Sequence, residues 1–525
     1  MLNQAGHGSS QSTFSPLREP QAMQDRDDGS QSRLSTDRGR GSVWLPTSML
    51  LCSLVVAVAF PRFSQGAVFP PYFDQEEVFT GHLRPTAIRF APNGNVFVAE
   101  KSGMIYAYED IEDTTKTLVV DLNLKVHAFW DRGLLGLAVD PGYPTVPYIY
   151  VLYAFDAFDD GTYPRWGPGE TPSDEDPCPN PPGALGDGCV VHGLLSRIQI
   201  DPLTLQAIEL PISGIIGPDE PLLSSDWCLQ FPSHSLGDLV FGEDGYLYVS
   251  SGEGASFHSF DWGQEGSPQN PCDDPPDGFQ TASVPDPNNS VAAEGGALRS
   301  QDILTPSDRT DLSIPGRPDY VDRATFDGSL LRIDVSTLPV QAPADNPLVT
   351  LNTVPDDDLI VAMGLRNPFR INKRPGTQEI WITDVGWSTW EEINRVADPG
   401  GTVENFGWPC FEGDNSGNSI LDGYDQQELC QDLYDDNIPL GIDLEAPYYS
   451  YHHNQKVVPD ELCPTGTSSA TGLTFNTADV YPPVYDNALF FADSSRSCIW
   501  TMFADSQGNP DKNNRLALVS LAGGQ

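Results

Sequence analysis

The sequence predicts an all-β fold, and within that class a β-propeller, from two observations. After residue 67 one pattern recurs: a strand, a turn rich in Gly and Asn or Asp, and a second strand of alternating aromatic and β-branched residues. Helical periodicity is nearly absent. Repeated short hairpins are typical of propeller blades, which stack radially around a central channel. A sandwich is the alternative, but it does not explain why the same motif recurs through about 400 residues.

Five stretches carry this hairpin pattern. Two have tight turns of the Asn-Gly or Asp-Gly type, "PTAIRFAPNGNVFVAEKSGMIYAYE" and "GDLVFGEDGYLYVSSGEG". The others have longer turns that contain Pro, Gly or Asp. The five hairpins are expected at residues 85–109, 133–156, 237–254, 364–386 and 472–503.

Long insertions rich in Pro, Gly and Asp separate the hairpins at 157–190, 261–320 and 410–466. Loops of this length are uncommon unless they are functional or held in place. Eight cysteines remain beyond the N-terminal apolar run, mainly in or beside these insertions, which indicates disulfides that pin the loops in an oxidising compartment. We expect cysteines adjacent in sequence to pair, although their spacing leaves other pairings open. Asn288 in "NNS" is a glycosylation sequon.

The N-terminal region reads as a leader followed by an export signal. Residues 1–42 are polar and are expected to be disordered. The apolar run 43–60 and the small residues after it predict a signal peptide over 43–66, and Met49 would begin a compact signal by itself. The alternative, because the leader is long, is an uncleaved membrane anchor that displays an extracellular propeller. The signal peptide is the first interpretation and the anchor the second, so we expect a secreted protein.

The charge balance excludes some partners. The chain has 28 basic and 74 acidic residues, a formal net charge of −46, which repels nucleic acid and anionic membrane surfaces. Solubility of a secreted protein explains this acidity in general, and local Ca²⁺ binding by surface carboxylates is the second interpretation.

Six motifs occur in the order found in the glucose/sorbosone dehydrogenases: "DRGLLGLAVDPGY", "HSLGDLVFGEDGYLYVSSGEG", "DGSLLRID", "GLRNPFR", "DVGWSTWEEIN" and "ENFGWPCFEG". Over roughly residues 70–520 the chain resembles these soluble quinoproteins. The resemblance implies a six-bladed propeller, a pyrroloquinoline quinone (PQQ) cofactor, Ca²⁺, an aldose substrate and an external electron acceptor. Hedgehog-interacting proteins and their plant relatives carry a similar domain, for which dehydrogenase activity does not follow from the fold.

The resemblance assigns the catalytic roles to two residues. His234 matches the histidine that takes the hydroxyl proton as hydride leaves the sugar. Arg366, followed by Asn367 in "GLRNPFR", matches an Arg-Asn pair that contacts the cofactor, and its guanidinium would stabilise charge on the quinone. A structural histidine and a blade-to-blade arginine are the alternatives. Arg370 fits the structural interpretation better.

The resemblance also implies a metal site. Consecutive backbone carbonyls, which map to Gly386 and Trp387, bind the Ca²⁺ that touches the cofactor. Glu391 and Glu392 match an acidic pair near a further calcium in some relatives. Either glutamate could instead be a solvated carboxylate.

PQQ is a tricarboxylate, so its pocket needs cations. Arg132, Arg496 and Arg515 are the cofactor-binding candidates, although Arg496 is displaced by one residue from the family's lysine. Two further departures are Asp131, which would repel a carboxylate, and Ala517, where a second arginine is expected.

The resemblance also implies a further strand–turn–strand unit after "RLALVSLAGGQ" that completes the ring, so the last blade of the sequence given is expected to be incomplete. We therefore predict an exported, PQQ- and Ca²⁺-dependent dehydrogenase that oxidises an aldose to its lactone. The alternative is a secreted recognition propeller that binds carbohydrate or protein without catalysis.

Overall fold

The computed structural model describes residues 69–156, 191–208, 214–217, 227–257, 297–304, 325–349, 358–435, 442–477 and 481–520, apart from gaps of one or two residues inside several of these ranges. The chain divides into two units, Met1–Arg62 and Phe63–Gln525, and every described residue belongs to the second. The predicted leader, the predicted signal or anchor segment and Asn288 lie outside the described residues.

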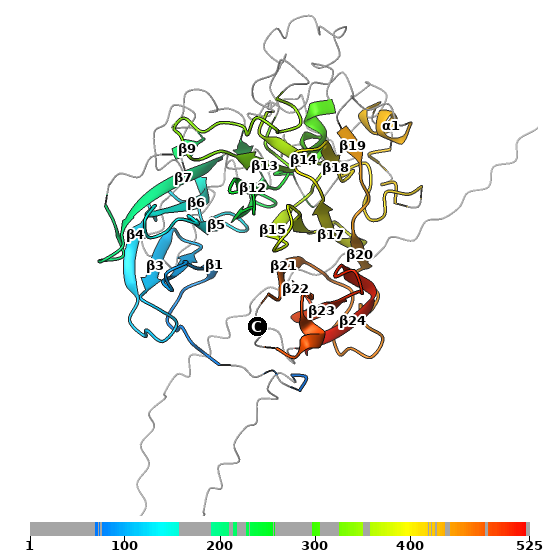
Figure 1. Ribbon diagram of the computed structural model, residues 1–525. Coiled ribbons are helices and arrows are strands. Elements are labelled where there is room, and N and C mark those ends of the chain that lie inside the picture. The colour runs from blue at the N-terminus through cyan, green and yellow to red at the C-terminus, as the bar shows by residue number, and fades with distance from the viewer. Residues whose placement is uncertain are drawn as a thin grey trace, which may run out of the picture. The chain divides into compact units, whose positions relative to one another are not determined.

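The described residues form five sheets of mainly antiparallel strands (Figure 1). The first sheet contains β1 (Pro85–Phe90), β2 (Val96–Glu100), β3 (Met104–Tyr108) and β4 (Thr117–Asp121). The second contains β5 (Leu134–Val139), β6 (Tyr148–Phe155), β7 (Val191–Asp201), β8 (Gln206–Ala207), β9 (Gly214–Ile216) and β10 (Cys228–Leu229).

The third sheet contains β11 (Leu236–Phe241), β12 (Leu247–Ser251), β13 (Ser329–Ile333), β14 (Ile360–Met363), β18 (Val403–Asn405) and β19 (Ile442–Leu444), the last two added in parallel. The fourth contains β15 (Pro368–Lys373), β16 (Ile380–Asp384), β17 (Trp390–Val396) and β20 (Tyr449–His452). The fifth contains β21 (Ala470–Phe475), β22 (Leu489–Asp493), β23 (Cys498–Ala504) and β24 (Pro510–Ser520). Helical residues within the described ranges form α1 (Glu428–Tyr434) and the short 3-10 segments Ala297–Leu304 and Pro483–Tyr485.

The strands confirm all five predicted hairpins. Each hairpin supplies the first two strands of one sheet, and Gly94 and Gly245 adopt the positive φ that the tight turns require. The first strands β1, β5, β11, β15 and β21 contact one another in this order. This radial succession is propeller-like, as predicted, while the sixth blade stays a prediction.

The core is divided into clusters that lie between successive sheets. One cluster joins the first and second sheets, another the second and third, and two more join the third to the fourth and the fourth to the fifth. Leu152 on β6 and Leu239 on β11 are both fully buried in the largest cluster. Since each buried side chain of this size contributes about 1.5–3 kcal/mol, packing between blades holds the sheets together.

Close approach of the innermost strands depends on a glycine. A Cβ atom at Gly237 on β11 would lie 2.3 Å from the carbonyl oxygen of Pro368 on β15. Only glycine therefore allows these two strands to lie so near each other. This contact fixes the positions of the segments that carry His234 and Arg366.

Charged groups link the sheets near the axis. The Asp238 carboxylate on β11 accepts a hydrogen bond from Arg89 on β1 at 2.5 Å, and Arg370 Nε on β15 lies 4.0 Å from the same carboxylate. Arg370 also donates to the carbonyl of Thr86 on β1, at 2.5 Å. These contacts confirm the structural interpretation of Arg370, because it joins the first, third and fourth sheets.

A strap, which we define as the described residues of 69–82, joins the first sheet to the fifth. Phe73 stacks on Tyr481 with ring centroids 4.5 Å apart, and Phe79 stacks on Tyr108 of β3 at 4.1 Å. Figure 1 shows this blue segment reaching from the β1 sheet toward the red one. The strap thus contacts both sheets with aromatic side chains rather than through strand pairing.

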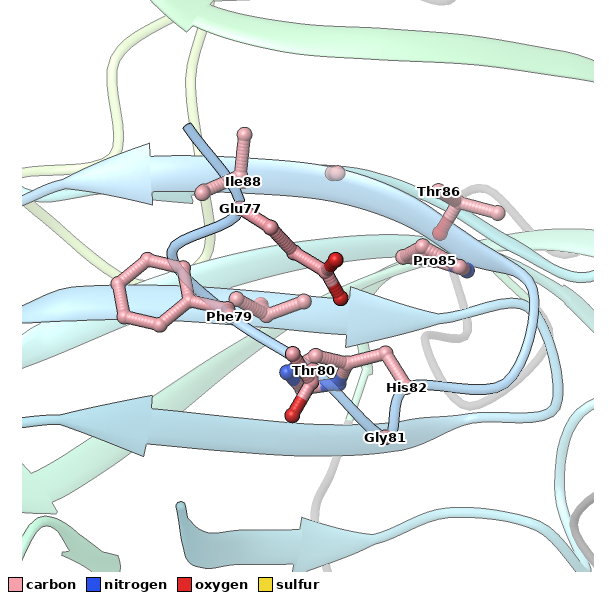
Figure 2. A pocket seen from close by; sticks show the side chains of 10 residues that line it. Glu77, Phe79, Thr80, Gly81, His82, Pro85, Thr86 and Ile88 are labelled. Carbon is pink, nitrogen blue, oxygen red and sulfur yellow. The ribbon is translucent and has the colours of Figure 1, made fainter. Parts of the chain in front are cut away.

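The strap and β1 line a cavity of about 540 Å³, which is open on one side (Figure 2). His82 lines it, with Nδ1 3.0 Å from Glu100 and Nε2 2.7 Å from the hydroxyl of Tyr108. None of the residues predicted to bind substrate, cofactor or metal lines this cavity.

Two of the expected disulfides are confirmed, Cys410–Cys430 and Cys463–Cys498. Each joins cysteines that are adjacent in the predicted series. The other four cysteines, or their side chains, lie outside the described part of the chain. Within the ranges that the structure covers, no helix has the length and apolar character needed to cross a bilayer.

Candidate active site

His234 lies two residues before the start of β11, and Glu253 lies two residues after the end of β12. These strands pair antiparallel with Leu236 opposite Ser251, so the same register places His234 opposite Glu253. The His234 Nδ1 atom lies 2.5 Å from a Glu253 carboxylate oxygen. His234 also has a φ of +47°, an unusual backbone conformation that occurs often at functional sites.

The surroundings of His234 favour a neutral ring. Burial, and then the nearby positive charge of Arg366, lower the pKa of His234 well below its ordinary value. A neutral imidazole that donates from Nδ1 to a carboxylate presents Nε2 as a proton acceptor. Within the described residues, Nε2 has no hydrogen-bond partner, so it is available to a ligand.

The backbone of Arg366 connects this pair to the next blade. Its carbonyl accepts a hydrogen bond from the Glu253 amide at 2.9 Å, and its amide donates to Asp384 at 2.9 Å. The Asn367 amide donates to the other Asp384 oxygen at 2.6 Å. Because Asp384 holds both residues, the turn before β15 lies next to the segment after β12, and Arg366 and Asn367 join the His234 group.

The Arg366 side chain reaches the predicted metal loop. Its Nη1 atom donates to the carbonyls of Val385 and Gly386, at 2.9 and 2.7 Å, and its guanidinium lies 5.3 Å from the ring centre of Trp408. The carbonyl predicted to bind Ca²⁺ is thus in contact with a cation that belongs to the chain itself. This contact indicates that the loop presents the electronegative surface that a cation needs.

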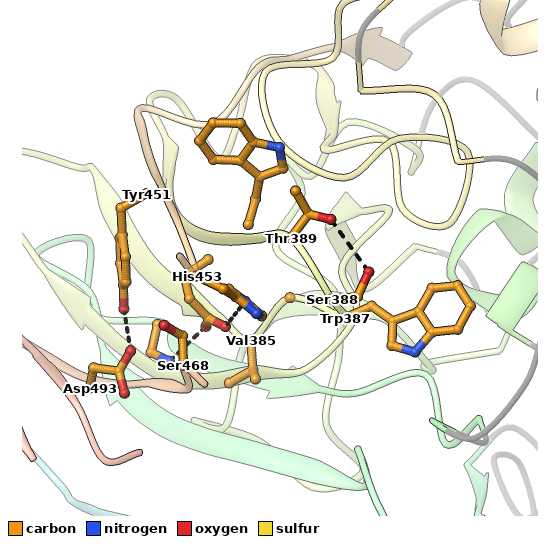
Figure 3. A network of polar contacts seen from close by, with 12 residues as sticks. Val385, Trp387, Ser388, Thr389, Tyr451, His453, Ser468 and Asp493 are labelled. Atoms are coloured by element: carbon orange, nitrogen blue, oxygen red, sulfur yellow. Dashed lines mark hydrogen bonds and ion pairs between the residues drawn. The ribbon is translucent and has the colours of Figure 1, made fainter. Parts of the chain in front are cut away.

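Trp387 and its neighbours follow in the same loop (Figure 3). The Trp387 indole donates to the carbonyl of Phe257, at 3.1 Å, and Ser388 and Thr389 share a hydroxyl contact of 3.4 Å. Phe257 lies 6.1 Å from the His234 ring, between ring centres. The structure therefore brings His234, Arg366, Asn367, Gly386 and Trp387 into one contiguous group.

Asp131 and Arg132 make contacts that differ from those expected of cofactor ligands. The Asp131 carboxylate accepts a hydrogen bond from the Ser233 hydroxyl, next to His234. Arg132 is fully buried and donates from Nη2 to the carbonyl of Leu229 at 2.8 Å. Both residues thus hold the segment that leads to His234, and the role of Arg132 toward a cofactor stays a prediction.

Arg496 and Arg515 lie in the fifth sheet, and none of their hydrogen bonds reaches the His234 group. Arg496 is fully buried and donates to Ser468 and to the carbonyls of His452, His453 and Gln455, at 2.6–3.0 Å. Arg515 on β24 donates to the carbonyl of Val457 at 3.2 Å. The structure does not bring these arginines together with Arg366, and their cofactor contacts stay predictions.

Glu391 and Glu392 are both buried on β17, which differs from the solvated alternative. A Glu391 carboxylate oxygen lies 2.8 Å from His453 Nε2, and Figure 3 shows His453 in the network of polar contacts that also contains Asp493. Glu392 accepts from the Gly413 amide at 2.7 Å. Burial raises the pKa of both carboxyl groups. No cluster of three or more His, Cys, Asp or Glu suited to a metal occurs among the residues that the structure describes.

Two residues that the sequence reasoning missed complete the site: Glu253 and Glu412. The regular register of the predicted hairpin would place Gly254 opposite His234, and only the irregularity between Leu236 and Leu239 shifts Glu253 into that position. Glu412 in "CFEG" accepts hydrogen bonds from the loop that follows Gly386. Its partners are separated from it by over twenty residues, and no local pattern marks them.

The fold and the site define an all-β, propeller-like protein with a histidine–carboxylate pair, His234 and Glu253, and an arginine, Arg366, beside its first strands. Residues 82–164 and 303–435 match the family model described as Glucose / Sorbosone dehydrogenase. This match confirms the resemblance that the six motifs predicted.

Two proteins of Arabidopsis thaliana are similar in sequence. The HIPL1 protein is 24% identical over 199 residues, which are 35% of this chain and 20% of that protein. The HIPL2 protein is 23% identical over 287 residues, which are 52% and 30%. The matched region therefore spans less than a third of the length of these relatives.

Two aldose sugar dehydrogenases are among the solved structures to which this chain is similar. The PQQ-bound enzyme from Streptomyces coelicolor is 14% identical with a TM-score of 0.45, over 84% of this chain and 83% of that chain. The apo form of the soluble Escherichia coli enzyme is 16% identical with a TM-score of 0.44, over 83% and 85%.

Proposed function

We propose that this protein is a secreted sugar dehydrogenase of the quinoprotein type, which oxidises an aldose to its lactone with PQQ and Ca²⁺. The observation that supports this most directly is the His234–Glu253 pair, whose Nε2 side has no partner among the described residues and whose neighbour is the Arg366 guanidinium. A six-bladed ring and export through the signal at 43–66 belong to the same proposal.

In this mechanism His234 accepts the proton of the anomeric hydroxyl at Nε2. The Glu253 carboxylate holds Nδ1–H and stabilises the imidazolium that forms. Arg366 supplies a fixed positive charge beside the histidine, which favours negative charge that develops on a bound ligand. When bound, PQQ would supply the two-electron acceptor for the hydride from the sugar carbon, with an external acceptor as its oxidant.

The chain's own groups fit a cation better than they fit the cofactor's carboxylates. The Gly386 carbonyl already receives a positive group, Arg366, at 2.7 Å, so carbonyl ligation of Ca²⁺ is chemically suited to this loop. The arginines predicted for the carboxylates, Arg132, Arg496 and Arg515, donate to backbone carbonyls of the protein. We assign no contact between them and the cofactor.

The decisive experiment is reconstitution. The full chain, exported from a eukaryotic host, is mixed with PQQ and Ca²⁺, and aldose-driven reduction of a dye is followed. We expect His234→Ala to abolish turnover. The control is Glu404→Gln, which should keep turnover, because Glu404 accepts a hydrogen bond from the Ala397 amide and none from the His234 group. Failure of the folded wild type to bind PQQ would refute the proposal.

A second candidate is a non-catalytic recognition propeller that binds carbohydrate or protein. The specific observation in its favour is that the three arginines predicted for the cofactor, Arg132, Arg496 and Arg515, donate hydrogen bonds to backbone carbonyls of the protein. The similarity to HIPL proteins is consistent with it. Glycan and protein binding by a PQQ-free preparation, unaffected by His234→Ala, would favour this candidate.

A further inference from the structure

The Glu412 carboxylate lies beneath the loop that runs from Gly386 to Trp390. Four consecutive backbone amides donate to its Oε1 atom: Trp387 at 2.9 Å, Ser388 at 3.0 Å, Thr389 at 2.9 Å and Trp390 at 3.1 Å. Glu412 is only 3% exposed. A buried carboxylate is costly unless donors compensate its charge, so these amides and this carboxylate stabilise each other.

This arrangement fixes the direction of the loop carbonyls. In a planar trans peptide unit the N–H and the C=O point in opposite directions. Amides from Trp387 to Trp390 that point toward Glu412 therefore direct the carbonyls of Gly386 through Thr389 away from it. The Gly386 carbonyl accordingly meets Arg366, at 2.7 Å. Gly386 and Trp387 are the two residues whose carbonyls the sequence predicts as Ca²⁺ ligands.

The loop leaves no room for a side chain at its first residue, Gly386. A Cβ atom at Gly386 would lie 1.5 Å from the Trp390 carbonyl oxygen and 3.1 Å from Glu412 Oε1. Gly386 is thus required for the loop to close around the carboxylate.

Glu412 is itself held in place by its own segment. Its amide donates to the carbonyl of Ser419, at 2.9 Å, and the next residue, Gly413, donates to Glu392. The Cys410–Cys430 disulfide lies two residues before Glu412. The carboxylate is therefore presented to the loop from a covalently anchored support.

From these contacts we propose that Glu412 is the positioning residue of a cation site made by the Gly386 and Trp387 carbonyls. The inference rests on the proposed function, since Ca²⁺ is the cation it names. Glu412 orients the carbonyls and adds a negative charge behind them. The Arg366 guanidinium donates a hydrogen bond to the Gly386 carbonyl of the same pair.

The test compares Glu412→Gln, Glu412→Ala and the charge-conserving Glu412→Asp with wild type and the control Glu404→Gln. Hydrogen exchange of the amides from Trp387 to Trp390, without metal, reports the loop. Terbium luminescence, sensitised by Trp387, reports the cation site. We expect exchange to quicken at least about tenfold in Glu412→Ala and Tb³⁺ affinity to fall about 10- to 100-fold in Glu412→Gln, as for other residues that orient metal ligands. Glu412→Asp should restore part of both.

The outcomes separate this inference from the proposed function. Normal Tb³⁺ binding with unchanged exchange in the Gln and Ala variants would refute the role of Glu412 and leave the proposed function intact. Absence of Tb³⁺ binding by folded wild type would refute the cation site and the calcium of the proposed function together. If wild type binds Tb³⁺ and shows the expected hydrogen exchange but does not reduce the dye with an aldose, only the proposed dehydrogenase activity is refuted. Near-ultraviolet circular dichroism identifies variants that have not folded, and Glu412→Gln keeps an acceptor oxygen if the alanine variant is unstable.

Discussion

His234 Nδ1 and a carboxylate oxygen of Glu253 lie 2.5 Å apart, at the two open ends of one hairpin. The register of β11 and β12 brings the two residues together, although 18 residues separate them in the chain. The same hairpin thus supplies both the proton acceptor and the group that orients it.

Replacement of Glu253 tests this pairing. Glu253→Gln keeps an acceptor of similar size but removes the charge that stabilises the imidazolium. We expect kcat for aldose oxidation to fall about 100-fold or more, with a smaller change in KM. Steady-state kinetics with Glu404→Gln as control checks this, and an unchanged kcat would show that the pair is only structural.

The pH dependence of catalysis follows from the lowered pKa of His234. The base must be neutral, and a lowered pKa keeps it neutral down to a more acidic pH than free imidazole, whose value is 6.5. We therefore expect kcat/KM to stay flat as the pH falls through 6.5 and to decline only below it. Arg366→Gln removes one cause of the shift and should move that decline to higher pH. A decline centred above pH 6.5 in the wild type would contradict the assignment.

The contact between Asp131 and Ser233 predicts a positioning effect. Ser233→Ala removes a donor to the Asp131 carboxylate, which holds the segment next to His234. We expect a loss of about 1–3 kcal/mol in unfolding free energy and a drop in kcat larger than the change in substrate affinity. Urea unfolding and kinetics on the same preparations measure both. Unchanged stability would mean that water replaces the serine without cost.

Glu404 gives a prediction for stability against pH. Burial raises the pKa of its carboxyl to about 7, above the ordinary 4.5. Between these values the folded state binds the proton more tightly, so stability is lost as the pH rises from about 4.5 to 7. Glu404→Gln removes this loss and should be more stable than wild type at pH 8 by about 1–3 kcal/mol, and less so at pH 5. Equal differences at the two pH values would refute the raised pKa.

The Cys463–Cys498 disulfide predicts a redox effect on the fifth sheet. It closes a segment with a sequence separation of 35, and both cysteines are buried in the cluster between the fourth and fifth sheets. Replacement of both cysteines by serine should cost about 2–4 kcal/mol. Denaturant unfolding, with and without reductant, measures this cost. Wild type should lose comparable stability on reduction, whereas the double variant should lose less.

The hairpins were predictable because their signals are local. Asn93–Gly94 and Asp244–Gly245 dictate tight turns, and the alternating residues beside them dictate strands, so β1, β2, β11 and β12 appear where expected. The two disulfides at Cys410–Cys430 and Cys463–Cys498 also follow sequence order. The number of blades does not follow from local signals, because it depends on how sheets close around an axis.

The site was predictable only in part, for a physical reason. His234, Arg366 and Gly386 lie on short motifs, and the structure brings them together. Arg496 resembles a free cation in sequence, but it is buried, and its carbonyl acceptors lie 41 to 44 residues earlier, at His452, His453 and Gln455. Glu412 shows the converse, because an ordinary glutamate becomes important only when a distant loop folds over it.

The strap has a consequence for how the molecule forms during synthesis. Phe73 leaves the ribosome early, but Tyr481 and Tyr485, the rings it packs against, are made over 400 residues later. The Phe73 side chain therefore stays exposed to solvent, or bound to a chaperone, until the residues of the fifth sheet have been synthesised. Contacts between such distant positions close late and slowly. The last step of folding should thus be the docking of the strap. A protease cut near Phe73 before that step would leave the sheets formed but without the aromatic contact between the strap and the fifth sheet.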